Sequence, residues 1–429
     1  MKKDNSKIFY DNISFRILSV YVLIGIACGL IIGLFKRAIG LVSDFMKGFI
    51  VKAHDNILLS LGVIILLVLI GTLIYYLAKR NSNIEGSGIP IIYGMLDNKI
   101  EVSSSRTLME KFVTSTLAIG SGLTLGREGP SVQIGGLIGD IGHKLSKSKE
   151  DRANFIGAAA GAGIAVAFNA PLAGILFTVE EIFHKTDRKT FLASSITIFS
   201  SILVSNFFFG NLPALKSLPL IKDIEPSMII YIMLLGVLCG LSGVLFNKLV
   251  IGSKAIYKKI KINPYIKYIS IFVITGIVLI MDINLFASGE EFIYLPIGEN
   301  KSISQLVILY VVKILLLCLA FGGSIPGGSL VPLIVLGSIL GNAFGVLLNN
   351  LGIIDSSSIL LFAMLAMGGH FSAIVRAPIT AVILVFEMSG GIFNYLLYLA
   401  VVSLIAYLVA EVFKSKPFYT HLYELMVEK

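Results

Sequence analysis

Residues 124–136 read TLGREGPSVQIGG, so an arginine and a glutamate stand side by side in an apolar run and are followed by a proline and several glycines. If this run lies in a membrane, burying a charge there costs roughly 2.5 to 3.5 kcal/mol, and such residues are by default functional. The alternative is a structural role, in which Arg127 and Glu128 form a buried ion pair that holds helices together. The rest of the chain is needed to choose between the two.

The composition around this stretch is that of a membrane protein. Of the 429 residues, 56% are hydrophobic and 14% are charged, which lies outside the usual balance of a soluble domain. A helix that crosses a bilayer needs roughly 20 apolar residues. The candidate runs are residues 17–35, 57–77, 228–250 and 393–412 and, with their flanks, 268–281 and 306–321. The sequence therefore predicts a single all-helical domain over residues 1–429 that spans the membrane several times.

Other apolar runs are shorter and are interrupted by glycine or proline: residues 86–96, 130–141, 171–179 and 332–348. Irregular backbone at membrane depth is tolerated only where it is buried in protein or lines a cavity. These runs therefore predict broken helices inside the protein, which a purely structural membrane span would not need.

The basic residues indicate which side of the membrane the connections face. The net charge is +9, and short cytoplasmic loops carry an excess of lysine and arginine. The clusters that predict cytoplasmic connections are Lys2, Lys3, Lys7 and Arg16; then Lys185, Arg188 and Lys189; then Lys254, Lys258, Lys259, Lys261 and Lys267. The acidic connection around Glu290 predicts the opposite side. We expect a multi-pass protein of the cell membrane with both termini in the cytoplasm.

The three cysteines, Cys28, Cys239 and Cys318, lie in separate apolar runs without the CxxC spacing of redox or metal sites. We therefore expect no disulfide framework, no metal and no other cofactor. The N-terminal stretch up to Cys28 could also be a signal peptide with a lipid-attachment cysteine. The apolar run continues past Cys28 without a cleavage-like break, which favours a membrane span.

The sequence contains an internal repeat. Residues 161–180, GAGIAVAFNAPLAGILFTVE, align with residues 368–387, GGHFSAIVRAPITAVILVFE, at a constant offset of 207. Just before each copy, PSVQIGGLIG from Pro130 aligns with PLIVLGSILG from Pro332. Repeats with broken helices are how many transporters build a site near the middle of the bilayer. We expect two halves of one fold, at about 17–212 and 227–413, with a C-terminal helix at 414–429.

Three short motifs place glycines ahead of a proline: GSGIP at residues 86–90, GREGP at 126–130 and GGSLVP at 327–332. Proline fits the first turn of a helix, where its missing N–H is no loss. Each motif can therefore begin a helix inside the membrane, with unpaired backbone N–H groups at the positive end of its dipole. Helix ends that converge would hold a partly dehydrated anion without a full positive charge, which would bind it too tightly for release. The alternative, that the glycines only allow close helix packing, explains the Gly-Pro clusters poorly.

Glu128 then has a function in this scheme. A carboxylate at a helix N-terminus is itself an anion, so it can occupy the site meant for the substrate and be displaced or protonated away.

These motifs resemble those of the CLC family of chloride channels and chloride/proton exchangers, and FNAPLAGILFTVEE at residues 168–181 adds to the likeness. The resemblance covers nearly the whole chain. It implies a membrane fold of two inverted repeats with broken and re-entrant helices, assembled as a homodimer with one ion pathway in each subunit. The chain ends soon after Tyr419, so we expect no regulatory nucleotide-binding domain pair of the kind many relatives carry.

The resemblance also implies roles for single residues. Ser87 and Tyr419 would bind chloride through their hydroxyls, the backbone N–H groups of Ser329 and Leu330 would complete the cradle, and Glu128 would be the outer gating glutamate. The supporting residues would be Gly86, Gly88, Arg127, Gly129 and Glu180. Two positions depart from the family pattern, because an aromatic residue usually stands at Leu330 and an acidic one often stands at Ile91. Ser87 favours chloride, since proline there accompanies nitrate transport, and asparagine or methionine accompanies fluoride transport.

The pair Glu180-Glu181 bears on the choice between a channel and an exchanger. Successive helix residues point about 100° apart, so only one of the two can face a given pathway. By resemblance that residue is Glu181, which aligns with the inner proton-transfer glutamate of the exchangers; the alternative is that both are solvated at a helix end. We expect an exchanger of chloride for protons, with a chloride channel as the nearest alternative.

An enzyme is the alternative from another class. An intramembrane hydrolase could use buried serine and histidine residues, but the sequence has no HExxH and no paired intramembrane aspartates. His143, His184 and His370 have no recognisable nucleophile or metal partner at useful spacing and are interpreted as structural. The glycine-rich stretches lack the GK[ST] ending of a nucleotide-binding loop.

Overall fold

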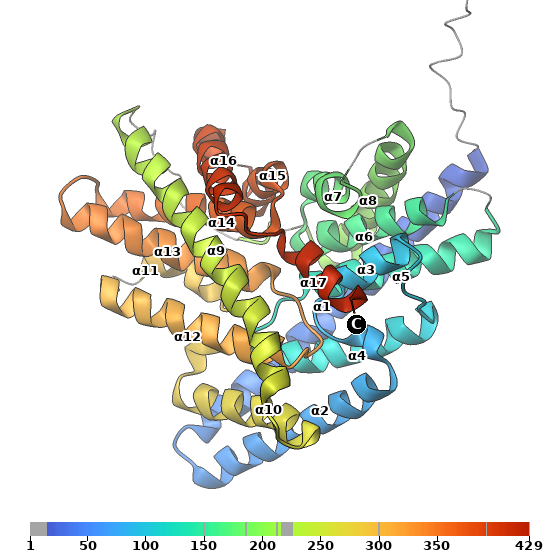
Figure 1. Cartoon of the computed structure of the whole chain (residues 1–429), viewed down its shortest axis with the longest axis horizontal. Coiled ribbons are helices and arrows are strands. Elements are labelled where there is room, and N and C mark those ends of the chain that lie inside the picture. Colours follow the sequence, from blue (N-terminus) through green and yellow to red (C-terminus); the bar gives the residue numbers. More distant parts are fainter. Residues whose placement is uncertain are drawn as a thin grey trace, which may run out of the picture.

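The computed structural model describes residues 15–148, 151–184, 187–211, 213–215, 226–298, 301–391 and 393–428. Lys2, Lys3, Lys7 and Lys185 of the predicted basic clusters lie outside these residues. Within them the protein is almost entirely helical (Figure 1), which confirms the all-helical prediction. In the described ranges, nine helices are long and apolar enough to cross a membrane. The chain is a multi-pass membrane protein.

The first half of the chain forms eight α-helices. Their bounds are α1 Phe15–Ala53, α2 Ile57–Arg80, α3 Ile89–Leu96, α4 Ser104–Gly120, α5 Glu128–Ser146, α6 Arg152–Phe168, α7 Pro171–Phe177 and α8 Arg188–Phe209. Helix α7 continues into the π-helical turn η3, Thr178–Ile182, which widens the helix directly before the loop that follows. Such π turns occur frequently at functional sites.

The second half runs through a similar series. Its helices are α9 Ile229–Lys259, α10 Pro264–Met281, α11 Leu295–Gly298, α12 Ile303–Gly322, α13 Leu330–Asn350, α14 Ile359–Val375, α15 Pro378–Met388 and α16 Leu396–Val412. A final helix, α17 Phe418–Val427, follows the short connection after α16.

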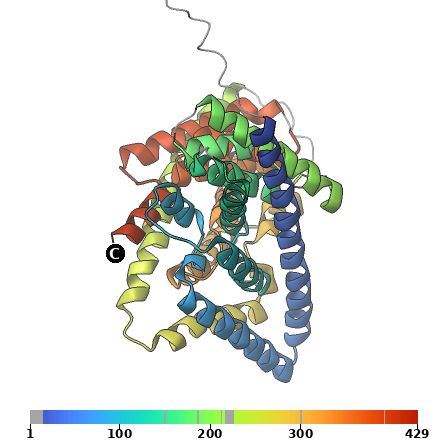
Figure 2. The same ribbon diagram turned by 90° about the vertical axis from the view of Figure 1, so that its right-hand side faces the viewer.

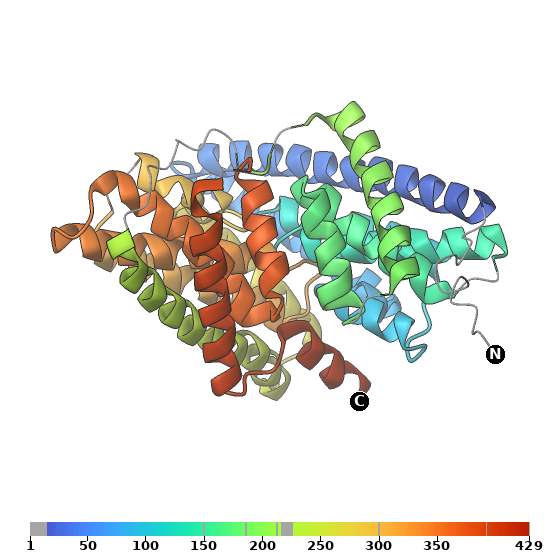
Figure 3. The same cartoon turned by 90° about the horizontal axis from the view of Figure 1, so that it is seen from above.

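The packing of the two halves also corresponds. Helix α5 packs on α6 as α13 packs on α14, and α1 packs on α8 as α9 packs on α16. The halves meet where α2 lies beside α10 and where α7 lies beside α15. Figure 1 shows most first-half helices on one side of the molecule and the second-half helices on the other, with α17 between them. The long helix α1 runs along the outside of the protein (Figures 2 and 3).

The interior is filled by the helices that carry the sequence repeats. Every residue of α14 is buried, whereas the outer helices expose large apolar side chains such as Leu61, Ile65 and Leu69 of α2. An exposed apolar surface of this kind suits contact with lipid. The predicted spans are confirmed as helices, but α1 extends well beyond residue 35, and the spans α8, α13 and α14 were not among them. Two of the four predicted broken segments are confirmed, since α3 and α7 end after eight and seven residues. The other two are wrong as broken helices, because residues 130–141 and 332–348 lie in the continuous helices α5 and α13, of 19 and 21 residues.

Candidate anion and proton site

The three glycine-proline motifs meet in the centre of the protein. Gly126 and Gly328 form an antiparallel bridge in which each backbone N–H donates to the other carbonyl at 2.7 Å. The first motif joins the third, because Gly86 donates to the Ser324 carbonyl at 2.9 Å and accepts from the Gly327 N–H at 3.1 Å. The beginnings of α3, α5 and α13 are thereby fixed together, although they come from both halves of the chain.

Only glycine fits at this meeting point. A β-carbon on Gly129 would lie 2.6 Å from the Ser87 carbonyl oxygen and 3.2 Å from the Gly328 Cα, so three motifs touch at one residue. Gly88 has φ +91°, a conformation that other residues rarely adopt, and a β-carbon there would also collide with the Gln133 side chain. The glycines let three backbones approach closely enough for their N–H groups to share one small space.

Three hydroxyl groups lie in or beside this space. The side chains of Ser87, Ser329 and Tyr419 are 3%, 0% and 0% exposed. The Tyr419 hydroxyl, brought in by α17, lies 3.3 Å from the Ser329 Oγ. Within the described part of the chain, the buried Ser87 Oγ has no hydrogen bond of regular geometry, although it lies near the Tyr419 hydroxyl. A buried unsatisfied hydroxyl is costly, so the Ser87 hydroxyl is available to a ligand.

Glu128 begins α5 and is fully buried. Its carboxylate folds back against Gly126, where a β-carbon would collide with Oε2, and that position also touches Val331 N and Pro332 at the beginning of α13. Neither carboxylate oxygen has a hydrogen-bond partner in regular geometry among the described residues. The carboxylate therefore lies beside two helix N-termini without being locked to either of them, as the sequence argument predicts for a displaceable anion.

Arg127 does not form a tight pair with Glu128. Its Nε lies 3.6 Å from the Glu128 Oε1, and its guanidinium lies 3.5 Å from the Glu290 carboxylate. Arg127 also lines a cavity of about 350 Å³ together with Lys36 and Lys47. Its lining also includes Gly126, Glu290 and Glu291, so the cavity lies between the acidic connection and the beginning of the GREGP motif. Sequence reasoning missed Glu290 and Lys36 as neighbours of the site, because their positions in the chain give no signal of this contact.

The structure separates the roles of Glu180 and Glu181. The Glu180 carboxylate accepts from the backbone N–H groups of Ile379 at 3.1 Å and Thr380 at 2.7 Å and so caps α15. Glu181 is 1% exposed, and its Oε1 accepts a hydrogen bond from the Tyr93 hydroxyl at 2.7 Å. Neither residue is simply solvated at a helix end. Tyr93 was not singled out in the sequence, which contains no motif that pairs it with Glu181.

A buried lysine supports the first motif. Lys111 of α4 is 0% exposed and donates from Nζ to the carbonyls of Ile84 at 2.8 Å and Gly86 at 2.7 Å. It therefore holds the turn that presents Ser87. The sequence gave no indication of this role, because Lys111 follows Glu110 and resembles a lysine on the surface of a helix.

The two departures from the family motifs are both buried. Leu330 is the first residue of α13 and is 0% exposed, and Ile91 of α3 is 2% exposed. The first-turn N–H groups of α13 have no partner within the helix, so Leu330 leaves the backbone of this end available to an anion.

The described residues include no group of three or more His, Cys, Asp or Glu side chains that could hold a metal. His370 is buried, with Nδ1 2.7 Å from the Leu333 carbonyl oxygen and Nε2 3.1 Å from the Ser242 hydroxyl, a serine partner that the sequence analysis did not identify. The chemistry available at the centre is anion binding by helix ends and hydroxyls, combined with two buried carboxylates that can carry protons.

The comparisons with known proteins agree with this geometry. Residues 68–411 match the family described as "Voltage gated chloride channel". The H(+)/Cl(-) exchange transporter ClcA of Vibrio vulnificus strain YJ016 is 33% identical over 432 residues, covering 97% of this chain and 91% of the relative. That of Vibrio campbellii is 34% identical over 423 residues, covering 95% and 89%. The crystal structure of a slow cyanobacterial Cl⁻/H⁺ antiporter is similar with a TM-score of 0.90 at 27% identity, covering 96% of this chain and 98% of that one.

Proposed function

Because this chain belongs to the voltage-gated chloride channel family, the CLC family that its motifs resemble, we propose that it exchanges chloride for protons across the membrane. The relatives that match over nearly its whole length are named as exchange transporters, which favours an exchanger over a passive channel. The intramembrane hydrolase is set aside, since the family consists of ion transport proteins.

One observation carries the proposal: the beginnings of α3, α5 and α13 converge on a buried point that contains the Ser87 hydroxyl and the Glu128 carboxylate. Chloride and a carboxylate have the same charge, so both are attracted by the positive helix ends. Protonation of Glu128 removes its charge and lets chloride take its place. Return of chloride to solution lets the carboxylate re-enter, so the two fluxes are coupled by competition.

The chloride cradle in this proposal consists of Ser87, the N–H groups of Ser329 and Leu330, and Tyr419. The supporting residues are Gly86, Gly88 and Gly129, which allow the close approach, and Arg127, which raises the potential for anions at the outer side. Glu128 gates the site and receives protons from the outer side. Glu181 passes protons to and from the inner side, and Glu180 fixes the turn on which Glu181 lies by capping α15.

The proposal extends to topology and assembly. Both termini lie in the cytoplasm and the protein lies in the cell membrane, in keeping with the basic ends of α2 and α9. Residues 17–212 and 227–413 form two inverted repeats, which the recurring order of helices supports. The protein is a homodimer with one pathway in each subunit, and exposed apolar side chains such as Leu203 of α8 and Leu404 of α16 are available for such contact.

The test is ion flux in liposomes that contain the purified protein. A chloride gradient is imposed, the voltage is set with potassium and valinomycin, and the external pH is recorded. We expect the chloride gradient to drive protons against their own gradient, and Glu181→Ala to lose proton movement while chloride flux persists. Chloride flux without protons in the unaltered protein would establish a channel instead.

A further inference from the structure

A cavity of about 530 Å³ lies next to Glu181, yet Glu181 does not line it. The walls near Glu181 come from α3, from the end of η3 with the loop that follows, and from α17; their residues are Tyr93, Ile182, Phe183, His184, Thr420 and Tyr423. Since Glu181 is 1% exposed, a proton from the inner solution has to pass one of these side chains to reach it.

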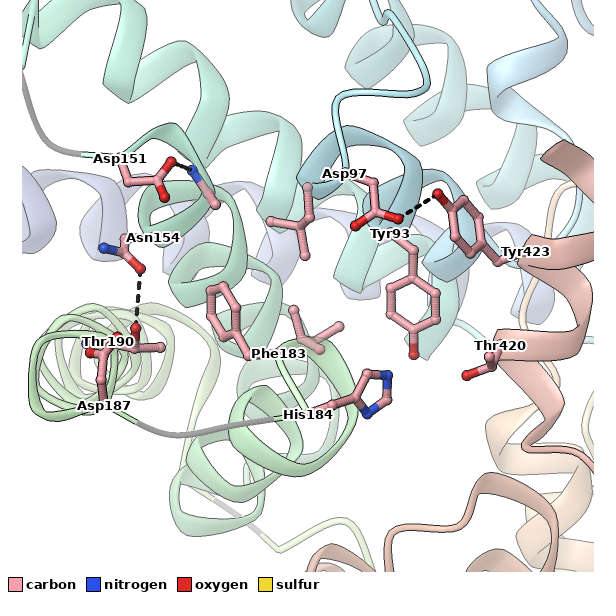
Figure 4. Close-up of a pocket in the computed structure, with 13 residues that line it drawn as sticks. Tyr93, Asp97, Asp151, Asn154, Phe183, His184, Asp187, Thr190, Thr420 and Tyr423 are labelled. Carbon is pink, nitrogen blue, oxygen red and sulfur yellow. Dashed lines mark hydrogen bonds between the residues drawn. The ribbon is translucent and has the colours of Figure 1, made fainter.

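Tyr93 stands at the boundary between the cavity and Glu181. Its side chain is 7% exposed, and its hydroxyl donates to the Glu181 Oε1 at 2.7 Å and, at 3.1 Å, to the Glu181 backbone carbonyl. Figure 4 shows the Tyr93 hydroxyl, the His184 ring and the Thr420 hydroxyl turned toward the same space. A hydroxyl both donates and accepts, so the Tyr93 oxygen can accept from the cavity while it donates to Glu181.

The charge of the cavity suits protons and opposes chloride. Its lining includes the carboxylates of Asp97, Asp151 and Asp187. A second cavity, of about 590 Å³, lies beside Ser324 and has the opposite character, with one glutamate, Glu85, among four lysines, Lys79, Lys254, Lys258 and Lys267. Clefts lined by one sign of charge concentrate the opposite ion. The inner face therefore offers chloride an approach that does not pass Tyr93.

The three carboxylates are already engaged in structural contacts. Asp151 and Asp187 cap α6 and α8 through the N–H groups of Ala153 at 3.0 Å and Thr190 at 2.7 Å. Asp97 accepts from the Tyr423 hydroxyl at 2.7 Å. Burial and the Asp97 carboxylate raise the pKa of Tyr423 to about 12, so that hydroxyl remains a donor at physiological pH.

His184 is placed to exchange protons with the cavity. Its Nδ1 lies 3.0 Å from the Glu180 carbonyl oxygen. Because a carbonyl only accepts, Nδ1 carries the hydrogen and Nε2 is the nitrogen that can gain a proton. The His184 and Tyr93 rings pack edge to face, with 6.0 Å between their centroids, so the two side chains are neighbours in the cavity wall.

Other titratable or charged groups surround Tyr93 without offering this path. Two of these groups lie on α17: Tyr419 is buried, and Tyr423 donates to Asp97, the C-cap of α3. On α6, Arg152 donates to the Met95 carbonyl at 3.5 Å. Glu181 and His184 remain as the acceptor and the donor on the two sides of the phenol.

We propose that Tyr93 relays protons between this cavity and Glu181, with His184 as the group on the cavity side; the inference rests on the exchanger function proposed above. A proton leaves the Nε2 of protonated His184, or a hydronium ion in the cavity, and forms a new O–H bond at the Tyr93 oxygen, so the donor becomes neutral imidazole or water. The original Tyr93 O–H bond breaks, and its proton forms an O–H bond on the Glu181 carboxylate. The phenol is neutral before and after the step, and rotation of its hydroxyl restores the starting arrangement.

The test is Tyr93→Phe in the liposome assay, with chloride and proton fluxes measured in the same vesicles. We expect chloride flux within about two-fold of the unaltered protein and proton flux at least ten-fold lower. Tyr93→His, which restores a group that can carry a proton, should recover part of the proton flux. Tyr423→Phe is the matched control, because it removes a hydroxyl from the same cavity wall and should leave the coupling unchanged.

Each outcome is decisive. If Tyr93→Phe keeps the full proton flux, or if both fluxes fall together in protein that still elutes as a folded species, Tyr93 is not a relay. If Tyr93→Phe cannot be purified, the test uses Tyr93→His alone, with proton flux measured at several values of inner pH. A pH dependence that differs from that of the unaltered protein supports the relay, and an unchanged pH dependence overturns it. Chloride flux without protons in the unaltered protein would instead refute the exchanger function itself.

Discussion

The two halves of the chain share their helix order and packing but differ in their acidic side chains. Glu128 begins α5 in the first half, and the aligned residue that begins α13 is Leu330. Glu181 follows α7, and the aligned residue at the end of α15 is Met388. Both halves provide a helix N-terminus at the centre, whereas the two buried glutamates among the described residues, Glu128 and Glu181, both come from the first half.

This difference separates two tasks within one architecture. Binding an anion needs several helix N-termini around one point, so both halves contribute such an end and both need glycines that let their backbones approach closely. Carrying protons needs a titratable group at each step, and one series of such groups is sufficient. If the proposed repeats arose by duplication, the second half has retained the helix ends while apolar residues occupy the proton positions.

The largest effect is expected when Glu128, the gating carboxylate that only the first half carries at this position, is removed. In Glu128→Ala the displaceable anion is gone, so chloride should pass freely and coupled proton movement should fall to background in the liposome assay. The matched change in the other half is Leu330→Met, which nearly conserves volume and should cost less than about 1.5 kcal/mol of stability. We expect Leu330→Met to retain coupling.

Two results would contradict this interpretation. Proton movement that survives in Glu128→Ala would show that Glu128 is not the gate. Loss of coupling in Leu330→Met, with chloride flux intact, would show that the second half also controls protons, through the residue that stands where the family usually has an aromatic.

An intermediate effect is expected at a pair of buried lysines that the halves do share. Lys111 of α4 holds the carbonyls of Ile84 and Gly86, and Lys313 of α12 holds those of Leu285 at 3.1 Å and Ala287 at 2.6 Å. Replacing either by methionine removes a donor from buried carbonyls, and each carbonyl left without a partner costs roughly 1–3 kcal/mol; the Gly86 carbonyl still accepts from the Gly327 N–H in Lys111→Met. We expect both Lys111→Met and Lys313→Met to unfold at lower temperature.

The two lysines should differ in chloride binding. Because Lys111 fixes Gly86 next to Ser87, Lys111→Met should weaken chloride binding about ten-fold by calorimetry, or about 1.4 kcal/mol. Lys313 fixes the connection near Glu290 and, at 3.3 Å, donates to the Thr124 hydroxyl ahead of the GREGP motif, but it does not hold the turn of Ser87. Lys313→Met should therefore change the chloride affinity by less than about two-fold. Equal weakening in both variants would mean that the lysines act through general stability and not through the Ser87 turn.

Much of the fold could be predicted from the sequence, because its signals are local. The apolar runs predicted most of the spans, and the glycines ahead of a proline predicted where α3, α5 and α13 begin. The span α8 was not predicted, although it is apolar enough to cross the membrane. Helix α14 is buried along its whole length, so it lacks the lipid-facing character of an ordinary span.

The site was predictable only in part. The motif residues that the sequence singles out do meet, because each motif encodes its own helix beginning. The contacts of Tyr93 with Glu181 and of Arg127 with Glu290 join residues far apart in the chain, and one sequence contains no local signal for them. Lys111 was missed for a related reason, since its partners are backbone carbonyls that leave no trace in residue identity.

The smallest expected effect tests a contact that is the same in both halves. Glu180 caps α15 through Ile379 and Thr380, and Glu387 caps α7 through the N–H groups of Leu172 at 3.1 Å and Ala173 at 2.8 Å. Loss of such a cap costs roughly 1 kcal/mol, and glutamine retains one accepting oxygen. We therefore expect Glu180→Gln and Glu387→Gln to lower the unfolding temperature by small and similar amounts.

A thiol-reactive dye can follow this unfolding, because Cys28 and Cys239 are buried in the folded protein. Both variants should keep the coupling of chloride to protons, since each carboxylate is fixed on a backbone and Glu181 is untouched. If Glu180→Gln alone lost proton movement at equal stability, Glu180 would be part of the proton path, and the asymmetry between the halves would extend to a residue that now looks the same in both.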